Sequence, residues 1–495
     1  MLNIENMAYT PANVREMDRT AIEDVGIPGY TLMVRAGQAT FDDARERFPA
    51  ARHWLVICGA GNNAGDGYVI ARLAREAGID ATAAAVTPPE KLTGDAARAR
   101  DDYLSSGASI PVFGASMCTS AELIFDAMLG TGLDRPLAGA YFDAVGAVEA
   151  AQVPVIAVDI PTGLNGASGE IMGAVVHADL TSTFVGLKLG FFLGAGPDCC
   201  GDLRFHDLDI PSDRLTAIQA TVQLYADSDV SSLLRPRASS AHKGRFGHVV
   251  IVGGNRGMGG AARLAGEAAL RAGAGLVSVA AHPDAAMAIA AGRPELMCHA
   301  TQAAAELDEL LQRASVVALG PGLGRDDWAR QLFQKVIGCP QPKVVDADGL
   351  NLLAEESLHR DDWVLTPHPG EAARLLGIDT AAVQADRIGT AAAIADQYGG
   401  IVILKGRGTL IAASGSQPVL IRRGNPGMAT AGMGDVLTGI VAGLLAQYPE
   451  SRLRAAAAAA YVHASAGDLA AADGERGLIA GDVLAHLRSV VNPVG

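Results

Sequence analysis

Short apolar runs alternate with stretches of helical pattern along almost the whole chain, and this alternation limits the fold more than any other feature of the sequence. In the N-terminal half we predict strands at 53–58, 80–86, 109–113, 123–127 and 153–159. Helices are expected between them, for example over Gly67–Ala77. Strands that alternate with helices are typical of α/β layers built on a parallel sheet. The sequence therefore predicts an α/β fold.

A second series of strands follows an irregular segment near 205–240, which is rich in Pro, Ser and mixed charges. These strands are predicted at 248–254, 275–281, 315–322, 343–349 and 362–368, followed by an antiparallel pair at 400–412 and 419–424. Such an irregular segment marks a domain boundary. We expect two three-layer α/β domains, 1–222 and 223–495.

Composition excludes several functional classes. Hydrophobic residues make up 49% of the 495 residues, enough for sizeable cores, and the formal net charge is -15. This charge argues against a protein that binds nucleic-acid backbones, although helix N-termini can still bind small nucleotides. The six cysteines are scattered without a CxxC pair, so reduced thiols are expected rather than disulfides or a zinc site. With no signal-peptide pattern and no long apolar segment, we expect a cytoplasmic protein that uses no membrane.

The stretch Gly59–Gly67 follows the first strand and formally fits the GxGxxG/A dinucleotide fingerprint. The fingerprint is incomplete, because no acidic residue ends the next strand to bind a ribose hydroxyl. Asp66 would also repel a pyrophosphate placed beside it. The glycine-rich turn can still hold an anion, while Asn62 and Asn63 offer amide oxygens to a cation or to hydroxyl groups.

Three further loops end strands on what should be the same carboxyl edge of the sheet, where open α/β sheets bind ligands. They are Asp126–Pro136, Asp159–Leu164 and Asp179–Lys188. Each carboxylate alone is as much a helix cap or turn former as a catalytic group. Together, oxygens of Asn63, Asp126 and Thr162 suit a hard monovalent cation, which leaves Asp159 as an acid or base.

The motifs GNNAGDG (61–67), DAMLGTGL (126–133) and VDIPTGL (158–164) resemble those of NAD(P)H-hydrate epimerases. The resemblance implies a Rossmann-like domain with potassium held by Asn63, Asp126 and Thr162. It also implies that the hydrated cofactor contacts Asn62, Asn63, Ala64, Gly65, Asp66, Gly130, Thr131, Gly132, Leu133, Asp134, Arg135, Pro136 and Asp159. Thr162 replaces the usual Ser and keeps its hydroxyl, whereas Ala64 in place of Gly matters only if φ there must be positive.

Three features of the second half suit phosphoryl transfer. Gly432–Asp435 precedes a helix with a buried apolar face, so its N–H groups can form an anion hole beside Asp435. Lys405–Thr409 joins two strands and places cationic and flexible groups where a polyphosphate could lie. Thr366–Glu371 ends a strand with a His and a Glu. The absence of GxxxxGK[ST] excludes a P-loop enzyme.

Together with GPGLG (320–324) and DADGLNLL (346–353), these features resemble ribokinase-like phosphoryl-transfer domains. The opening segment 242–277, Glu295–Met297 and His368 resemble the NAD(P)H-hydrate dehydratase branch, since vitamin kinases usually carry Asn in place of that His. Ala431 stands where Gly is frequent. The resemblance implies substrate contacts at Ala261, Gly322, His368 and Asp435, and ADP contacts at Lys405, Gly406, Arg407, Gly408, Thr409 and Gly434.

The two resemblances together imply a bifunctional enzyme that repairs hydrated NADH and NADPH. Asp159 would serve the epimerase, and Asp435 would serve dehydration of the S epimer, with magnesium and ADP giving AMP and phosphate. The expectation that ADP rather than ATP is the phosphoryl donor rests only on the fused two-domain layout, which resembles that of bacterial family members. The alternatives are a vitamin-alcohol kinase with an accessory N-terminal binding domain, and a non-catalytic first domain. We expect a homo-oligomer, with the Ala-rich helix at 455–472 buried either at its interface or inside the monomer.

Overall fold

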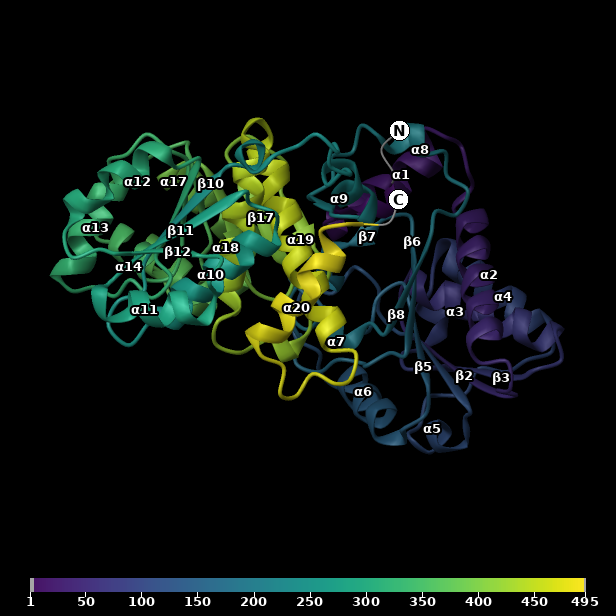
Figure 1. Cartoon of the computed structure of the whole chain (residues 1–495). Helices are drawn as coiled ribbons and strands as arrows, with labels where there is room; N and C mark the ends of the chain where they lie inside the picture. Colours follow the sequence, from purple (N-terminus) through teal and green to yellow (C-terminus); the bar gives the residue numbers. More distant parts are fainter. Residues whose placement is uncertain (1–3, 494–495) are drawn as a thin grey trace. The chain divides into compact units, whose positions relative to one another are not determined.

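The computed structural model describes residues 4–493, and the chain divides into two compact units, Met1–Val222 and Gln223–Gly495 (Figure 1). The outermost residues of the two predicted domains, 1–3 and 494–495, lie outside the described part. In that part no helix is both long and apolar enough to cross a membrane. All six cysteines are free thiols.

The first unit is built on a parallel sheet with strand order β3-β2-β4-β5-β6-β8. A separate short pair, β1 with β7, is also parallel. The strands are β1 (Met7–Tyr9), β2 (His53–Cys58), β3 (Asp80–Ala85), β4 (Leu123–Ala127), β5 (Val155–Val158), β6 (Leu180–Phe184), β7 (Leu187–Lys188), β8 (Asp202–His206) and, at the boundary, β9 (Val222–Leu224).

Helices cover both faces of this sheet, because alternate residues of each strand point to opposite sides. Trp54 and Val56 of β2 join one apolar core with α1 to α4, while Leu55 and Ile57 join another with α5 and α6. The helices are α1 (Pro11–Glu23), α2 (Gly29–Arg47), α3 (Asn62–Glu76), α4 (Gly94–Ser105), α5 (Ser116–Ser120), α6 (Ala140–Ala151), α7 (Gly196–Cys199) and α8 (Ser212–Leu215). The unit therefore has the predicted three layers.

The structure corrects local predictions at residues 109–113 and at the start of α3. Residues 109–113 form no strand but a single β-bridge between Val112 and Ala85. Pro111 has no N–H group to donate to a neighbouring strand, and the Val112 side chain is exposed. Helix α3 begins at Asn62 rather than Gly67. The glycines after Asn62 are helical because they permit close packing: a Cβ on Gly67 would lie 2.7 Å from the Cβ of Ala127.

The second unit has strand order β12-β11-β10-β13-β14-β15-β16-β17-β18-β9. Strands β10 to β16 are parallel, and β17 pairs antiparallel with both β16 and β18. The strands are β10 (His248–Val252), β11 (Leu276–Ala281), β12 (Met297–Ala300), β13 (Val316–Leu319), β14 (Lys343–Val345), β15 (Trp363–Leu365), β16 (Ile401–Leu404), β17 (Thr409–Ala413) and β18 (Val419–Ile421). The predicted segment 400–412 holds β16 and β17, joined by a turn near 405–408, in agreement with the prediction that Lys405–Thr409 joins two strands.

The helices of the second unit pack closely through small residues. A Cβ on Gly439 of α18 would lie 2.0 Å from the carbonyl oxygen of Ala265 on α10. The helices are α9 (Asp227–Leu233), α10 (Gly259–Arg271), α11 (Pro283–Gly292), α12 (Asp308–Arg313), α13 (Asp327–Ile337), α14 (Asp348–Leu353), α15 (Pro369–Leu376), α16 (Thr380–Ala385), α17 (Arg387–Tyr398), α18 (Met433–Gln447), α19 (Arg452–Ala470) and α20 (Ala480–Val490).

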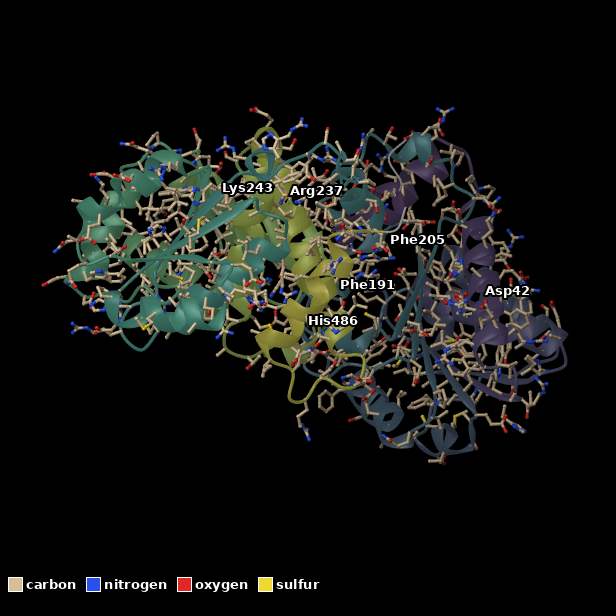
Figure 2. The ribbon with its side chains drawn as sticks, in the orientation of Figure 1. Asp42, Phe191, Phe205, Arg237, Lys243 and His486 are labelled. Atoms are coloured by element: carbon tan, nitrogen blue, oxygen red, sulfur yellow. The ribbon has the colours of Figure 1, made fainter. Side chains whose placement is uncertain are left out.

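The Ala-rich helix α19 is buried inside the second unit. Its run Ala455–Ala460 belongs to the apolar core that α10, α18 and α20 share. Of the two places predicted for this helix, the structure shows the interior of the monomer. Figure 2 shows the side chains of both units, with buried Phe191 and exposed Asp42 among the labelled ones.

Candidate functional sites

The carboxyl ends of β2, β4, β5 and β6 meet at one edge of the first sheet, as predicted for the loops after β2, β4 and β5. The segment 179–188, predicted as a fourth loop, instead contains β6 and β7, so Asp179 lies at the opposite edge, where it accepts from the Val155 N–H (2.8 Å). A cavity of about 430 Å³ lies there, and its walls also include α1 and α2. The predicted contacts that line it are Asn62, Asn63, Asp66, Gly130, Thr131, Gly132 and Asp159. Ala64 and Gly65 are instead buried within α3, and 133–136 are not among the lining residues.

Asp159 is held in a strained conformation in this cavity. Its φ is 70°, and that of Val185, which also lines the cavity, is 67°. Lys188 is almost fully buried and pairs with the Asp159 carboxylate. The Lys188 ammonium also donates to Thr183 Oγ1 (2.8 Å) and to the Phe184 carbonyl (3.0 Å). Positive φ in non-glycine residues is costly and clusters at active sites, so the strain supports a functional Asp159.

Two more carboxyl groups line the cavity. Burial raises the pKa of Asp66 well above its usual range, and the charges of Asp159 and Asp18 raise it further. Burial likewise raises the pKa of Asp18 to about 6. The nearby ammonium of Lys188 is already paired with Asp159. Burial thus favours the protonated form of Asp66, which weakens its repulsion of a bound phosphate.

Asp126 and Thr162 accept hydrogen bonds from the N–H groups of Met128 (3.2 Å) and Leu129 (3.0 Å), two residues that line this cavity. Thr162 donates to the fully buried Asp126 carboxylate twice, from its hydroxyl and from its backbone N–H, each at 2.7 Å. Burial raises the pKa of Asp126 to about 6. Asn63 is 93% buried, and neither atom of its amide group has a hydrogen-bond partner. An unpartnered amide oxygen, a carboxylate and a hydroxyl are oxygen donors that fit a hard cation.

In the second unit, the ends of β13 to β16 carry the predicted loops. Asp346, buried just after β14, accepts from Lys405 Nζ (2.7 Å) and from Thr438 Oγ1 (2.7 Å). Burial lowers the pKa of Lys405, but the charges of Asp346 and Glu371 outweigh this effect, so the pKa of Lys405 is raised overall. A Cβ on Gly434 would lie 3.3 Å from Lys405 Nζ. The loop before α18 therefore lies against this ion pair.

Asp435 lies in the first turn of α18, a helix that begins directly after Gly432, whose φ is 89°. Burial and the charge of Asp346 raise the pKa of Asp435 to about 7, while Lys405 opposes the shift. A general base works best when its pKa lies near the working pH. The positive φ is taken by Gly432 rather than by Ala431, so the departure at Ala431 imposes no strain.

His368 caps helix α15. Its Nδ1 accepts from the N–H groups of Gly370 (3.0 Å) and Glu371 (3.3 Å), and its Nε2 lies 3.4 Å from Glu371 Oε1. The ring is half exposed, so its Nε2 edge is accessible. Gly322 and Ala261 are also neighbours, since a Cβ on Gly322 would lie 3.2 Å from that of Ala261.

Several residues at these sites were not singled out from the sequence. The sequence prediction places Lys188 only at the end of a segment, although a lone lysine within the apolar run 184–195 is a signal. Asp346 belongs to the motif DADGLNLL, which by itself assigns no role to its first residue. Asp18 and Arg387 lie on helices far away in sequence, and no local pattern connects them to either site.

Comparison with known proteins decides the family. Residues 249–488 match the family described as NAD(P)H-hydrate dehydratase, and residues 29–190 match that described as YjeF-related protein N-terminus. The bifunctional NAD(P)H-hydrate repair enzyme Nnr of Coxiella burnetii is 45% identical over 98% of this chain and 99% of its own. That of Escherichia coli is 42% identical over 99% and 95%.

The chain belongs to the bifunctional NAD(P)H-hydrate repair enzymes. A ribokinase-like protein of Enterococcus faecalis matches 55% of this chain and 95% of its own, with 28% identity and a TM-score of 0.51. The ADP/ATP-dependent NAD(P)H-hydrate dehydratase of Bacillus subtilis, crystallised with ATP and Mg²⁺, matches 54% and 97%, with 28% identity and a TM-score of 0.50.

These findings confirm the predicted fold class and function. The chain is a repair enzyme for hydrated NADH and NADPH that joins an epimerase to a nucleotide-dependent dehydratase with a ribokinase-like fold. Membership over nearly the full length favours this function over the vitamin-alcohol kinase. It also accounts for both halves of the chain, which an accessory binding domain would not.

Proposed function

We propose that the first unit interconverts the R and S hydrates of NADH and NADPH, and that the second unit dehydrates the S epimer at the expense of ADP. The observation that carries the proposal is Asp435, a partly buried carboxylate with a pKa of about 7 in the first turn of α18. Magnesium would enter with the nucleotide phosphates. Nucleotide contacts are assigned to Lys405–Thr409 and Gly434, and substrate contacts to Ala261, Gly322 and His368.

In the dehydratase, Asp435 removes the proton of the ring hydroxyl. The hydroxyl oxygen then attacks the terminal phosphoryl group of ADP, and AMP leaves. The N–H groups at the start of α18 stabilise the charge on the transferred group. The phosphate next leaves the ring carbon, driven by the lone pair of the ring nitrogen, and the neighbouring carbon loses a proton. The products are NAD(P)H, AMP and phosphate.

In the epimerase, Asp159 acts as acid and base at the same ring carbon. Loss of the hydroxyl group as water leaves a flat C=N bond, and water returns to the opposite face. Lys188 keeps the Asp159 carboxylate in place, and Asp66, whose pKa is raised by burial, lines the same cavity. Asn63, Asp126 and Thr162 would hold potassium, which supplies a fixed positive charge for positioning a phosphate group.

Epimerisation can be tested in the native full-length chain by withholding nucleotide, because the dehydratase is then idle. Pure R hydrate of NADH, incubated with the protein and potassium, should approach an R and S mixture much faster than without protein. Asp159→Asn should reduce the protein-dependent rate by about 10²-fold or more. An unchanged rate in this variant would reject Asp159 as the acid and base.

Donor choice, location and assembly complete the proposal. ADP should support faster dehydration than ATP. The two donors leave different products, AMP from ADP and ADP from ATP, so an assay of the released nucleotide distinguishes them directly. The cytoplasm is the proposed location, and homo-oligomers are proposed as the native state. Nucleic acids and membranes are not proposed as partners, in keeping with the net charge of -15.

A further inference from the structure

Arg387, the first residue of α17, is a buried cation without an anion. Its side chain is 96% buried, and within residues 4–493 its guanidinium forms no ion pair. Burial lowers its pKa to about 10. It also lies at the N-terminal end of a helix, where a positive charge is unfavourable. Because an unpaired buried charge is costly, the position needs a specific explanation.

The hydrogen bonds of Arg387 converge on one loop. Its Nη2 donates to the carbonyl oxygens of Leu404 (3.3 Å), Lys405 (3.2 Å) and Gly408 (3.3 Å). Its Nη1 donates to Gln384 Oε1 at 3.1 Å. Leu404 ends β16, and the other two carbonyls belong to the turn between β16 and β17, the segment to which the proposed function assigns the nucleotide phosphates.

Holding these carbonyls fixes the direction of the loop's N–H groups. In a trans peptide, the C=O of one residue and the N–H of the next point in opposite directions. With the Lys405 carbonyl turned to Arg387, the Gly406 N–H points away from it. In the described part of the chain, neither Gly406 nor Arg407 donates a backbone hydrogen bond to the protein. Successive free N–H groups in such a turn form an anion site.

We propose that Arg387 is the positioning residue of the nucleotide loop, holding the carbonyls of 404–408 behind it so that the free N–H groups face the phosphates. This inference rests on the proposed nucleotide role of 405–409. Gly406 supports it, because its φ is 127° and a Cβ there would lie 3.1 Å from Arg387 Nη1. The loop and the guanidinium therefore fit each other closely.

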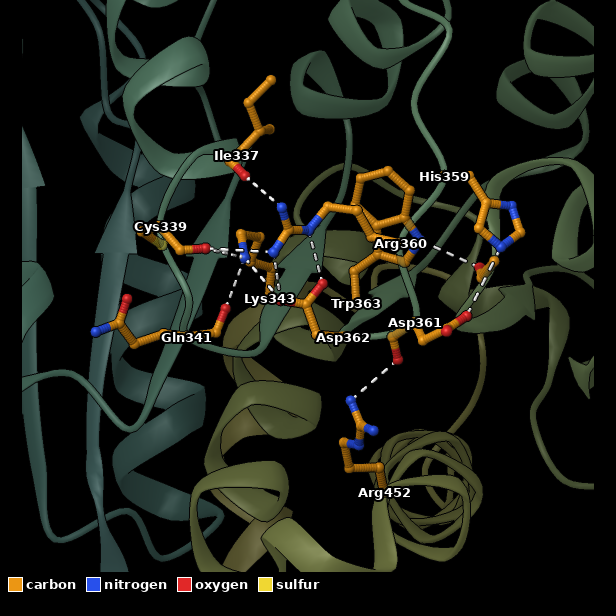
Figure 3. A network of polar contacts seen from close by, with 11 residues as sticks. Ile337, Cys339, Gln341, Lys343, His359, Arg360, Asp361, Asp362, Trp363 and Arg452 are labelled. Carbon is orange, nitrogen blue, oxygen red and sulfur yellow. Dashed lines mark hydrogen bonds and ion pairs between the residues drawn. The ribbon is translucent and has the colours of Figure 1, made fainter.

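The chain offers a matched control in Lys343, at the start of β14 (Figure 3). It is another fully buried cation, and it donates to the carbonyls of Cys339 (2.8 Å) and Gln341 (2.7 Å). It also pairs with Asp362. Asp346 and the candidate site lie beyond the other end of β14. Lys343 therefore makes the same kind of hydrogen bonds to carbonyls as Arg387, but without contact with the nucleotide loop.

The test compares Arg387→Lys, Arg387→Gln and Lys343→Gln in the full-length chain, with the KM for ADP, the KM for NADH hydrate and the melting temperature as readouts. Both Arg387 variants should raise the KM for ADP at least about tenfold, the ratio expected for lost charge-assisted hydrogen bonds. The KM for the hydrate and nucleotide-free epimerisation should stay unchanged. Lys343→Gln should lower only the melting temperature.

Gly406→Ala decides the matter if the Arg387 variants fail to fold, because its new Cβ would press on the Arg387 guanidinium and its positive φ would strain the loop while Arg387 itself is kept. It should raise the KM for ADP as well. An ADP affinity unchanged in folded Arg387→Lys, or in Gly406→Ala, would overturn the inference. If Lys343→Gln raised the KM for ADP as much as the Arg387 variants, their effect would be a general loss of structure, and the inference would be wrong. A wild-type chain that does not consume ADP would instead refute the proposed function.

Discussion

At the scale of single residues, Asp435 makes a pH-dependent prediction. Burial and Asp346 raise its pKa to about 7, and only the ionised carboxylate can accept the proton of the ring hydroxyl. The kcat/KM for dehydration should therefore rise with pH through about 7 and level off above it. Asp435→Asn should lower it by about 10²- to 10⁴-fold. A flat profile between pH 6 and 8 would contradict this role.

Lys188 gives a second prediction at this scale. Lys188→Met leaves the Asp159 carboxylate without its buried partner, which should lower the free energy of unfolding by about 3 kcal/mol and stop epimerisation. Arg72→Met is the matched control, because Arg72 pairs with Glu76 on the surface of α3 and should cost under about 1 kcal/mol. Denaturant unfolding and the nucleotide-free assay measure both. Full epimerase activity in folded Lys188→Met would reject the positioning role.

Which residues could be predicted depends on how far along the chain their partners lie. Asp126 lies near the end of a strand, Asp159 directly follows one, and Asp435 lies in the first turn of a helix, so local sequence shows them. Lys188 and Arg387 act through bonds that only the folded chain brings together. A buried cation that donates to backbone carbonyls leaves no pairing pattern in the sequence.

At the scale of elements, the contact between α10 and α18 predicts a stability effect. A Cβ on Gly439 would lie 2.0 Å from the Ala265 carbonyl, so Gly439→Ala must separate the two helices. We expect a loss of about 1–3 kcal/mol, as for an overpacked core. In Gly260→Ala the new Cβ meets nothing within 4 Å, so its melting temperature should be unchanged or higher. Equal melting temperatures for the two variants would refute the packing argument.

Strand positions were largely predictable because buried parallel strands read as apolar runs. The errors have local causes. Pro111 breaks the pattern that 109–113 otherwise shows, and the glycines after Asn62 suggested a loop although close packing against β4 requires them in a helix. The strand predicted at 343–349 ends at Val345, because Ala347 has a φ of 47° and α14 begins at Asp348.

At the scale of the whole molecule, the central claim is that one chain carries two separable activities. The two sites lie in different units, and the substrate diffuses, so the activities need not be in the same copy. Full-length Asp159→Asn and Asp435→Asn chains, each defective in one step, should therefore complement each other when mixed.

The most direct measurement starts from pure R hydrate of NADH with magnesium, potassium and ADP, and follows the return of reduced-nicotinamide absorbance. Wild-type protein should recover all of the NADH. Asp159→Asn should be limited to the rate of spontaneous epimerisation, Asp435→Asn should recover none, and their mixture should restore recovery. Recovery by Asp159→Asn at the wild-type rate, or no recovery by the mixture, would contradict the account.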